Sequence, residues 1–177
     1  MTKNETLAAK TKKIFKEIIF KYNDDFSNEK FLNLVDAHPS IFNIEHLVEL
    51  TMAKVGGYKF IDAEHCDFSD GSECKTGGVR PNAEKGPSHR VEISNTISPG
   101  GTVKAGDLRT VIYNAVTDSL EYFFIPKDNI FYMSNLHPTT GMGRIFATYN
   151  RDKKQIRKLE SFRCMDFEKL CTQPTTK

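Results

Sequence analysis

The chain has 177 residues, of which 38% are hydrophobic and 27% are charged, and its formal net charge is +2. This length and composition indicate one folded domain with a buried core and exclude an intrinsically disordered chain. A net charge so close to zero also excludes a strong overall attraction to nucleic acid, so any such binding must come from local basic patches. No apolar run approaches the ~20 residues of a membrane span and no signal-peptide core is present, so we expect a cytoplasmic protein without membrane contacts.

Helices are predicted in the first third of the chain. Residues 4–22 carry apolar side chains at near-helical spacing with lysines between them, which predicts an amphipathic helix that packs on a core or on a second subunit. A short helix is expected after Ser27, and a longer one over residues 44–55. Residues 1–56 are therefore predicted to be a helical region.

Five strands are predicted to follow these helices. Each is an apolar run bounded by Gly, Pro, Asn, Asp or Ser. They form a sheet core over residues 57–128, and residues 129–177 form a C-terminal basic segment of the same single domain, 1–177. The resulting fold class is α+β. The predicted strands span residues 58–68, 72–79, 89–96, 108–116 and 119–125.

The turn at Ser69–Gly71 is predicted to gather three reactive side chains. Ser-Asp-Gly is typical of a three-residue loop, in which a type I turn is followed by a left-handed residue that glycine adopts at no steric cost. With this loop Asp67 lies opposite Glu73, and alternation along the strands puts Asp67, Glu73 and Lys75 on one face. A two-residue Asp-Gly loop would put the two carboxylates on different faces, so the prediction depends on loop length. Asp70 itself is expected to be a turn residue.

These residue types suit metal-dependent cleavage of a phosphodiester bond. Carboxylate oxygens from adjacent strands can hold Mg²⁺, which keeps several waters and completes its shell with a substrate phosphate. The metal polarises the phosphoryl oxygen and helps to supply hydroxide. Lys75 would point at the same phosphate, where its ammonium stabilises developing charge or its amine helps to deprotonate the attacking water. The sequence leaves these two roles of Lys75 open.

Asp67 followed by Glu73-Cys74-Lys75 resembles the D…(D/E)xK signature of the PD-(D/E)xK nuclease superfamily, which includes most Type II restriction endonucleases. The middle residue of that signature is usually apolar and faces the core, and Cys74 suits this position. The two strands over 108–116 and 119–125, followed by Pro126-Lys127-Asp128, are similar to the strand pair and Pro-Lys-Asp segment that follow the active site in small homodimeric Type II enzymes.

The resemblance implies a restriction-endonuclease-like fold, with a central mixed β-sheet flanked by helices. It implies a Mg²⁺-dependent endodeoxyribonuclease that cuts double-stranded DNA as a homodimer, whose two-fold symmetry matches a palindromic site. Asp67 and Glu73 would be metal ligands together with the backbone carbonyl of Cys74, and Lys75 would be the catalytic amine. Asp62 is an alternative first ligand. Related nucleases sometimes recruit a helix glutamate to the metal, and Glu49 is the candidate here; the alternative is that Glu49 is a solvent-facing helix charge.

Two basic segments are candidates for DNA binding, because Lys and Arg neutralise phosphates and Arg can read guanine. One is the glycine- and proline-rich loop after the predicted catalytic strand, and Lys104 is a further candidate for a phosphate contact. The other lies near the C-terminus, where the alternative is a solvated hairpin turn at residues 150–152 with ordinary surface charges. The candidate DNA-binding residues are Arg80, Lys85, Lys104, Arg144, Arg151, Lys153, Lys154 and Arg157.

Two other functions stay open. A histidine-metal nuclease of the HNH type would be built around His65, His89 and Asn95, with a histidine activating water, and would tolerate loss of Lys75. A non-catalytic DNA-binding or regulatory protein would use the basic segments alone and would bind DNA without metal. Fold class does not choose among these functions.

The four cysteines, at positions 66, 74, 164 and 171, fit no disulfide framework for a chain of this size. We therefore expect reduced, buried thiols. A structural zinc site built from His65, Cys66, Cys74 and His89 is the alternative, although these residues contain no Cys-x-x-Cys pair.

Overall fold

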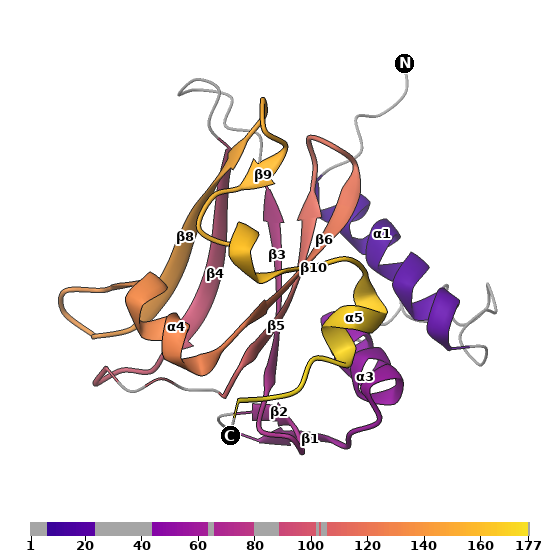
Figure 1. The fold of residues 1–177 in the computed structure, drawn as a ribbon, viewed down its shortest axis with the longest axis horizontal. Coiled ribbons are helices and arrows are strands. Elements are labelled where there is room, and N and C mark those ends of the chain that lie inside the picture. The colour runs from indigo at the N-terminus through magenta and orange to yellow at the C-terminus, as the bar shows by residue number, and fades with distance from the viewer. Residues whose placement is uncertain are drawn as a thin grey trace.

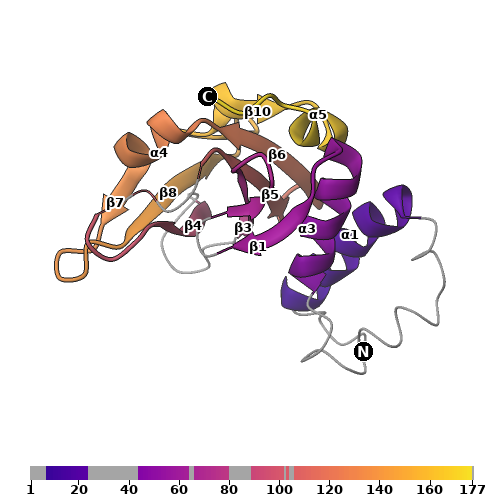
Figure 2. The same ribbon diagram turned by 90° about the horizontal axis from the view of Figure 1, so that it is seen from below.

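Curved β-sheets form the centre of the molecule, and helices cover one of their faces (Figures 1 and 2). The computed structural model describes residues 7–23, 44–63, 66–79, 89–101, 103 and 106–176. The arrangement is an α+β fold with mixed sheets flanked by helices, which confirms the predicted class. No helix within the described residues is long and apolar enough to cross a membrane.

Two long helices pack together on the helical side of the sheets. α1 (Leu7–Tyr22) and α3 (Ile44–Gly56) lie where two of the helices are predicted. Their apolar side chains recur at helical spacing and join one buried cluster, and Asn23 Nδ2 donates a hydrogen bond to Thr51 Oγ1 at 2.6 Å between the helices. The short helix expected after Ser27 lies outside the described residues.

The first sheet has four strands in the order β10-β6-β5-β3. Its central hairpin, β5 (Leu108–Asn114) and β6 (Ser119–Ile125), is antiparallel, and β10 (Arg163–Cys164) pairs with the outer edge of β6. β3 (Glu73–Val79) pairs with β5 in parallel. The chain leaves β3, forms β4 in another sheet and returns as β5, so this parallel pair is not formed by neighbouring strands in the sequence.

The second sheet is antiparallel, and it meets the first sheet along β3. A Cβ built on Gly77 of β3 would lie 3.4 Å from the backbone oxygen of Glu92 in β4, so the two strands are close neighbours. The strands of this sheet are β4 (His89–Ile97), β8 (Gly143–Asn150) and β7 (Ser134–Leu136), in that order, with β9 (Gln155–Ile156) paired to β8.

Both faces of the first sheet are buried, each against a different partner. The face that carries Cys74 and Val111 packs against α1, α3 and α5 (Phe167–Cys171). The opposite face, which carries Leu108 and Ile112, packs against apolar side chains of β4 and β8. Because β5 is covered on both sides, all seven of its residues are buried.

The C-terminal third contributes to both sheets. Four of the five predicted strands are confirmed within a few residues. The strand predicted over residues 58–68 is wrong, because β1 (Phe60–Ala63) and β2 (Cys66–Phe68) are two short strands that pair with each other antiparallel. No strand was predicted after residue 125, and this omission is also wrong. Along β8 buried and more exposed residues alternate, so one of its faces closes the second core. The missed elements are β7, β8, β9 and β10, together with α4 (Lys127–Met133), η2 (Glu160–Phe162) and α5.

Candidate functional site

The turn at Ser69–Gly71 has the predicted geometry. Gly71 has a φ of 84°, in the left-handed region that glycine adopts without strain. Its N–H donates to the carbonyl of Phe68 at 2.9 Å, and the Phe68 N–H donates to the carbonyl of Ser72 at 3.2 Å. These bonds are those of a three-residue loop, so the longer of the two loop lengths considered is confirmed.

The strands on either side of the turn do not continue as one hairpin. β2 (Cys66–Phe68) pairs with β1 (Phe60–Ala63), whereas β3 pairs with β5. Asp67 is therefore not the ladder partner of Glu73, and the predicted pairing of these two residues is wrong. Instead, Asp67 Oδ2 accepts a hydrogen bond from the backbone N–H of Cys74 at 2.7 Å. This bond places the Asp67 carboxylate beside β3, at the residue between Glu73 and Lys75.

Glu73 and Lys75 lie on the same face of β3 and form an ion pair. Glu73 is 7% exposed, and its backbone N–H donates to the carbonyl of Asp107 at 3.0 Å. Lys75 is partly exposed, and the parallel register places it beside Thr110 of β5. The structure thus places Glu73 and Lys75 side by side, with the Asp67 carboxylate bonded to the residue between them.

Cys74 points to the opposite face, into the core under the helices, as predicted for the middle residue of the motif. Burial raises the pKa of its thiol well above the usual range, and the negative charges of Glu49 and Asp67 raise it further. Glu49 Oε2 on α3 lies 3.1 Å from His46 Nδ1. Both carboxylates therefore lie near Cys74.

The carboxylates suit magnesium by type and number. No group of three or more His, Cys, Asp and Glu side chains is placed to hold a metal ion in the described part of the chain. Mg²⁺ is usually bound through only one or two carboxylates, with water and substrate phosphate completing its shell. Asp67, which is bonded to the Cys74 N–H, and Glu73, the residue before Cys74, are the two candidates for such a pair. The side chain of Asp62, the alternative ligand in β1, lies outside the described part of the structure.

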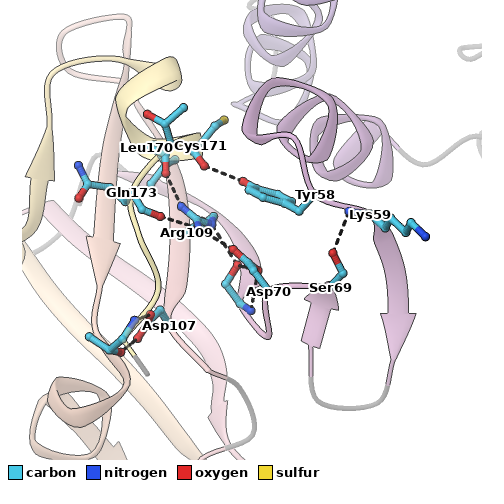
Figure 3. Close-up of polar contacts among 12 residues, drawn as sticks. Tyr58, Lys59, Ser69, Asp70, Asp107, Arg109, Leu170, Cys171 and Gln173 are labelled. Atoms are coloured by element: carbon cyan, nitrogen blue, oxygen red, sulfur yellow. Dashed lines mark hydrogen bonds and ion pairs between the residues drawn. The ribbon is translucent and has the colours of Figure 1, made fainter.

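A buried arginine is bonded to the turn (Figure 3). Arg109 is 1% exposed, and its guanidinium donates to Asp70 Oδ2 at 2.8 Å and to Ser72 Oγ at 3.0 Å. The guanidinium also stacks near the rings of Tyr58 and Phe124, each 5.1 Å from its centre. Arg109 therefore fixes the turn that precedes Glu73 onto β5.

Asp70 serves as a turn residue, as expected. It accepts hydrogen bonds from the Ser72 backbone N–H at 3.0 Å and from the Ser72 hydroxyl at 2.6 Å. Burial alone would raise the pKa of Asp70, but the bonds from Ser72 and the charge of Arg109 outweigh burial and lower this pKa.

The C-terminal segment is bonded to the same region. The guanidinium of Arg109 donates to the carbonyls of Leu170 and Gln173, as drawn in Figure 3. Asp107, which is 2% exposed, accepts from the backbone N–H of Lys127 at 2.7 Å and from that of Thr176 at 2.6 Å. Residues far apart in the sequence thus hold the start of β3 in place.

The sequence analysis missed the roles of Arg109 and Asp107. A signal for Arg109 was present, because it is a charged residue inside the apolar run of β5, where a side chain of this kind needs partners. Its partners come from the turn and from the C-terminal segment, and no local pattern identifies them.

The turn between β8 and β9 is basic and exposed. Asn150 Oδ1 accepts from the Lys153 backbone N–H at 3.1 Å, so the hairpin turn considered for this segment is confirmed. Arg144 is exposed and pairs with Glu92 at 2.9 Å. The remaining candidates in this part of the chain, Arg151, Lys153, Lys154 and Arg157, are all exposed. Arg80, Lys85 and Lys104 lie outside the described residues.

The groups of the two alternative metal sites are only partly described. His65 and the side chain of His89 lie outside the described part, and Asn95 is exposed on β4 with a φ of 57°. All four cysteines are free thiols. Burial raises the pKa of Cys164 and raises that of Cys171 to about 12, so both are predominantly protonated at neutral pH.

Comparison of the chain with protein-family models, with curated proteins and with solved structures gave no match.

Proposed function

We propose that this chain is a Mg²⁺-dependent endodeoxyribonuclease that hydrolyses phosphodiester bonds of double-stranded DNA, in the manner of a Type II restriction endonuclease. The observation that carries the proposal is the cluster at the start of β3. There Glu73 and Lys75 form an ion pair. The backbone N–H of Cys74, which lies between them, donates a hydrogen bond to the carboxylate of Asp67.

Asp67 and Glu73 would hold the metal, with the backbone carbonyl of Cys74 as a third oxygen. When bound, Mg²⁺ supplies Lewis-acid chemistry toward the scissile phosphate. Lys75 contacts the same phosphate and stabilises the charge that develops on it, or takes the proton of the attacking water. The hydrogen bond from the Cys74 N–H would orient the Asp67 carboxylate before substrate binds, and the backbone bond from the Glu73 N–H to the Asp107 carbonyl would hold the start of β3.

The remaining parts of the proposal concern partners. The exposed basic turn between β8 and β9 would contact DNA phosphates, together with Arg80, Lys85 and Lys104. A two-fold homodimer would place one cluster on each strand of a symmetric site, and a cytoplasmic location is consistent with this role.

Cleavage of unmethylated phage DNA, with Mg²⁺ and with EDTA, tests the proposal. We expect discrete Mg²⁺-dependent fragments from the wild-type chain, and a loss of rate of about 10²–10⁴-fold in Glu73→Gln and in Lys75→Ala. Glu17→Gln is the matched control, because Glu17 is an exposed carboxylate on α1. If the wild-type chain leaves several DNA substrates intact but binds them without metal, the non-catalytic alternative replaces the proposal.

A further inference from the structure

Thr110 is an unusual residue for its position in β5. It is 0% exposed, and it lies between Leu108 and Ile112 on the face that packs against the second sheet. Its Oγ1 is buried and has no hydrogen-bond partner among the described residues. A valine side chain has nearly the same shape and would leave no hydroxyl unpaired, so the hydroxyl needs an explanation beyond packing.

The register of the sheet places this hydroxyl next to Lys75. β3 and β5 are parallel, with Lys75 paired to Thr110 and Glu73 paired to Leu108. Paired residues of neighbouring strands point to the same face, so Thr110 flanks the base of the Lys75 side chain. The Lys75 ammonium is at the same time paired with Glu73.

The proposed function changes this pairing. If the Glu73 carboxylate binds metal, it is less available to the partly buried ammonium of Lys75, and an additional acceptor beside Lys75 offsets that loss. The Thr110 hydroxyl is buried beside Lys75 and has unused acceptor capacity.

We infer that Thr110 is a positioning residue for Lys75: its hydroxyl accepts a hydrogen bond from the Lys75 ammonium once Glu73 binds the metal. This inference rests on the proposed function. It assigns Thr110 no contact with DNA or metal, and it explains why a buried strand keeps a hydroxyl at this position.

Thr110→Val tests the inference through two measurements, thermal unfolding in EDTA and in Mg²⁺, and the single-turnover rate of cleavage of bound DNA. In EDTA we expect the variant to be at least as stable as the wild-type chain, because an unpaired hydroxyl has been removed. In Mg²⁺ we expect the variant to gain less stability than the wild-type chain. The single-turnover rate should fall by about tenfold with DNA affinity unchanged, since the variant cannot form the hydrogen bond to the charged ammonium.

Three comparisons separate positioning from packing. Thr110→Ser should retain the wild-type rate and the wild-type response to Mg²⁺, whereas Thr110→Ala should not; these two variants differ only by the hydroxyl, so they give the same test if the valine variant folds poorly. In a Lys75→Ala background, Thr110→Val should have no further effect on rate. Thr96→Val removes a buried hydroxyl that bonds Ser134, away from Lys75, and should leave the response to Mg²⁺ unchanged.

The outcomes are distinct. If Mg²⁺ stabilises the wild-type chain and Thr110→Val equally, and both cleave at the same single-turnover rate, the inference is overturned while the proposed function stands. If Mg²⁺ has no effect on the wild-type chain and no DNA is cleaved, both the proposed function and the inference are overturned.

Discussion

Asp67 and Cys74 are joined by a hydrogen bond of 2.7 Å from the Cys74 backbone N–H to Asp67 Oδ2. The bond crosses from the segment before the turn to the strand after it. It engages the Oδ2 oxygen of the carboxylate. The bond therefore orients Asp67 toward the neighbourhood of Glu73 even though β2 and β3 do not pair as a hairpin.

Asp67→Asn should separate this orienting role from metal binding. The amide oxygen can still accept from Cys74, but the negative charge that attracts Mg²⁺ is removed. We expect unfolding midpoints in EDTA to change little, and the Mg²⁺ concentration for half-maximal cleavage to rise about 10–100-fold. Titration of Mg²⁺ in a cleavage assay gives this concentration. If the Mg²⁺ concentration for half-maximal cleavage is unchanged, Asp67 is not a ligand and Asp62 takes its place as the candidate.

Arg109→Met should be strongly destabilising. Met fills much of the space but leaves the Ser72 hydroxyl and the carbonyls of Leu170 and Gln173 without their donor. Removal of one partner of a fully buried ion pair costs about 3–5 kcal/mol of unfolding free energy; because Asp70 is partly exposed, we expect a loss of about 3 kcal/mol. Urea unfolding measures the loss. Arg144→Met is the control, because the exposed pair of Arg144 with Glu92 is worth less than about 1 kcal/mol.

Asp70 should make stability depend on pH in the acid range. Its pKa is lowered in the folded chain from an ordinary value of 3.8, so its contribution is fully present above that value and is lost as pH falls through the lower, folded pKa. Urea unfolding at a series of acidic pH values should show a shallower loss of stability for Asp70→Asn than for the wild-type chain. Parallel curves would show that Asp70 does not contribute to acid unfolding.

The C-terminal segment should contribute measurably to stability. A chain that ends at Thr172 lacks the carbonyl of Gln173, which accepts from Arg109, and lacks Thr176, which donates to Asp107. Because Asp107 is buried, we expect a loss of about 1–3 kcal/mol in unfolding free energy. Thr176→Ser keeps both the backbone and hydroxyl donors and should be near wild type; equal stability of the shortened chain would contradict the role of this segment.

The basic turn between β8 and β9 should account for part of any DNA affinity. Replacing Arg151, Lys153 and Lys154 by Gln should weaken binding and reduce the slope of log affinity against log salt by about 0.9 for each phosphate that the variant no longer neutralises. Fluorescence anisotropy at several salt concentrations measures both quantities. Lys54→Gln, an exposed lysine on α3, is the control. An unchanged slope would assign DNA binding to another surface.

The sequence predicted local features well. The turn at Ser69–Gly71 was predictable because its conformation depends on one glycine at a left-handed position. The burial of Cys74 and the strands of the β5–β6 hairpin were predictable because apolar patterns report which residues face a core.

The remaining features depend on contacts between distant segments. The parallel pairing of β3 with β5 follows from packing, since turn chemistry favours pairing β3 with β2. The strands after residue 125 are short or interrupted by charges, and only their partners show that they are strands. The acceptors of Arg109 include Asp70 and Gln173, which lie so far apart in the sequence that no local pattern links them.

The turn before β3 and the start of β5 touch through backbone atoms. The Gly106 N–H donates to the carbonyl of Gly71 at 3.1 Å, and a Cβ at residue 106 would lie 2.2 Å from that oxygen. Any side chain at residue 106 must therefore push the turn away from β5. Only glycine fits at residue 106, whereas the exposed turns at the opposite end of the sheets can accept other residues. In laboratory evolution of the protein, variation can be directed to those turns while residues 71 and 106 are kept constant.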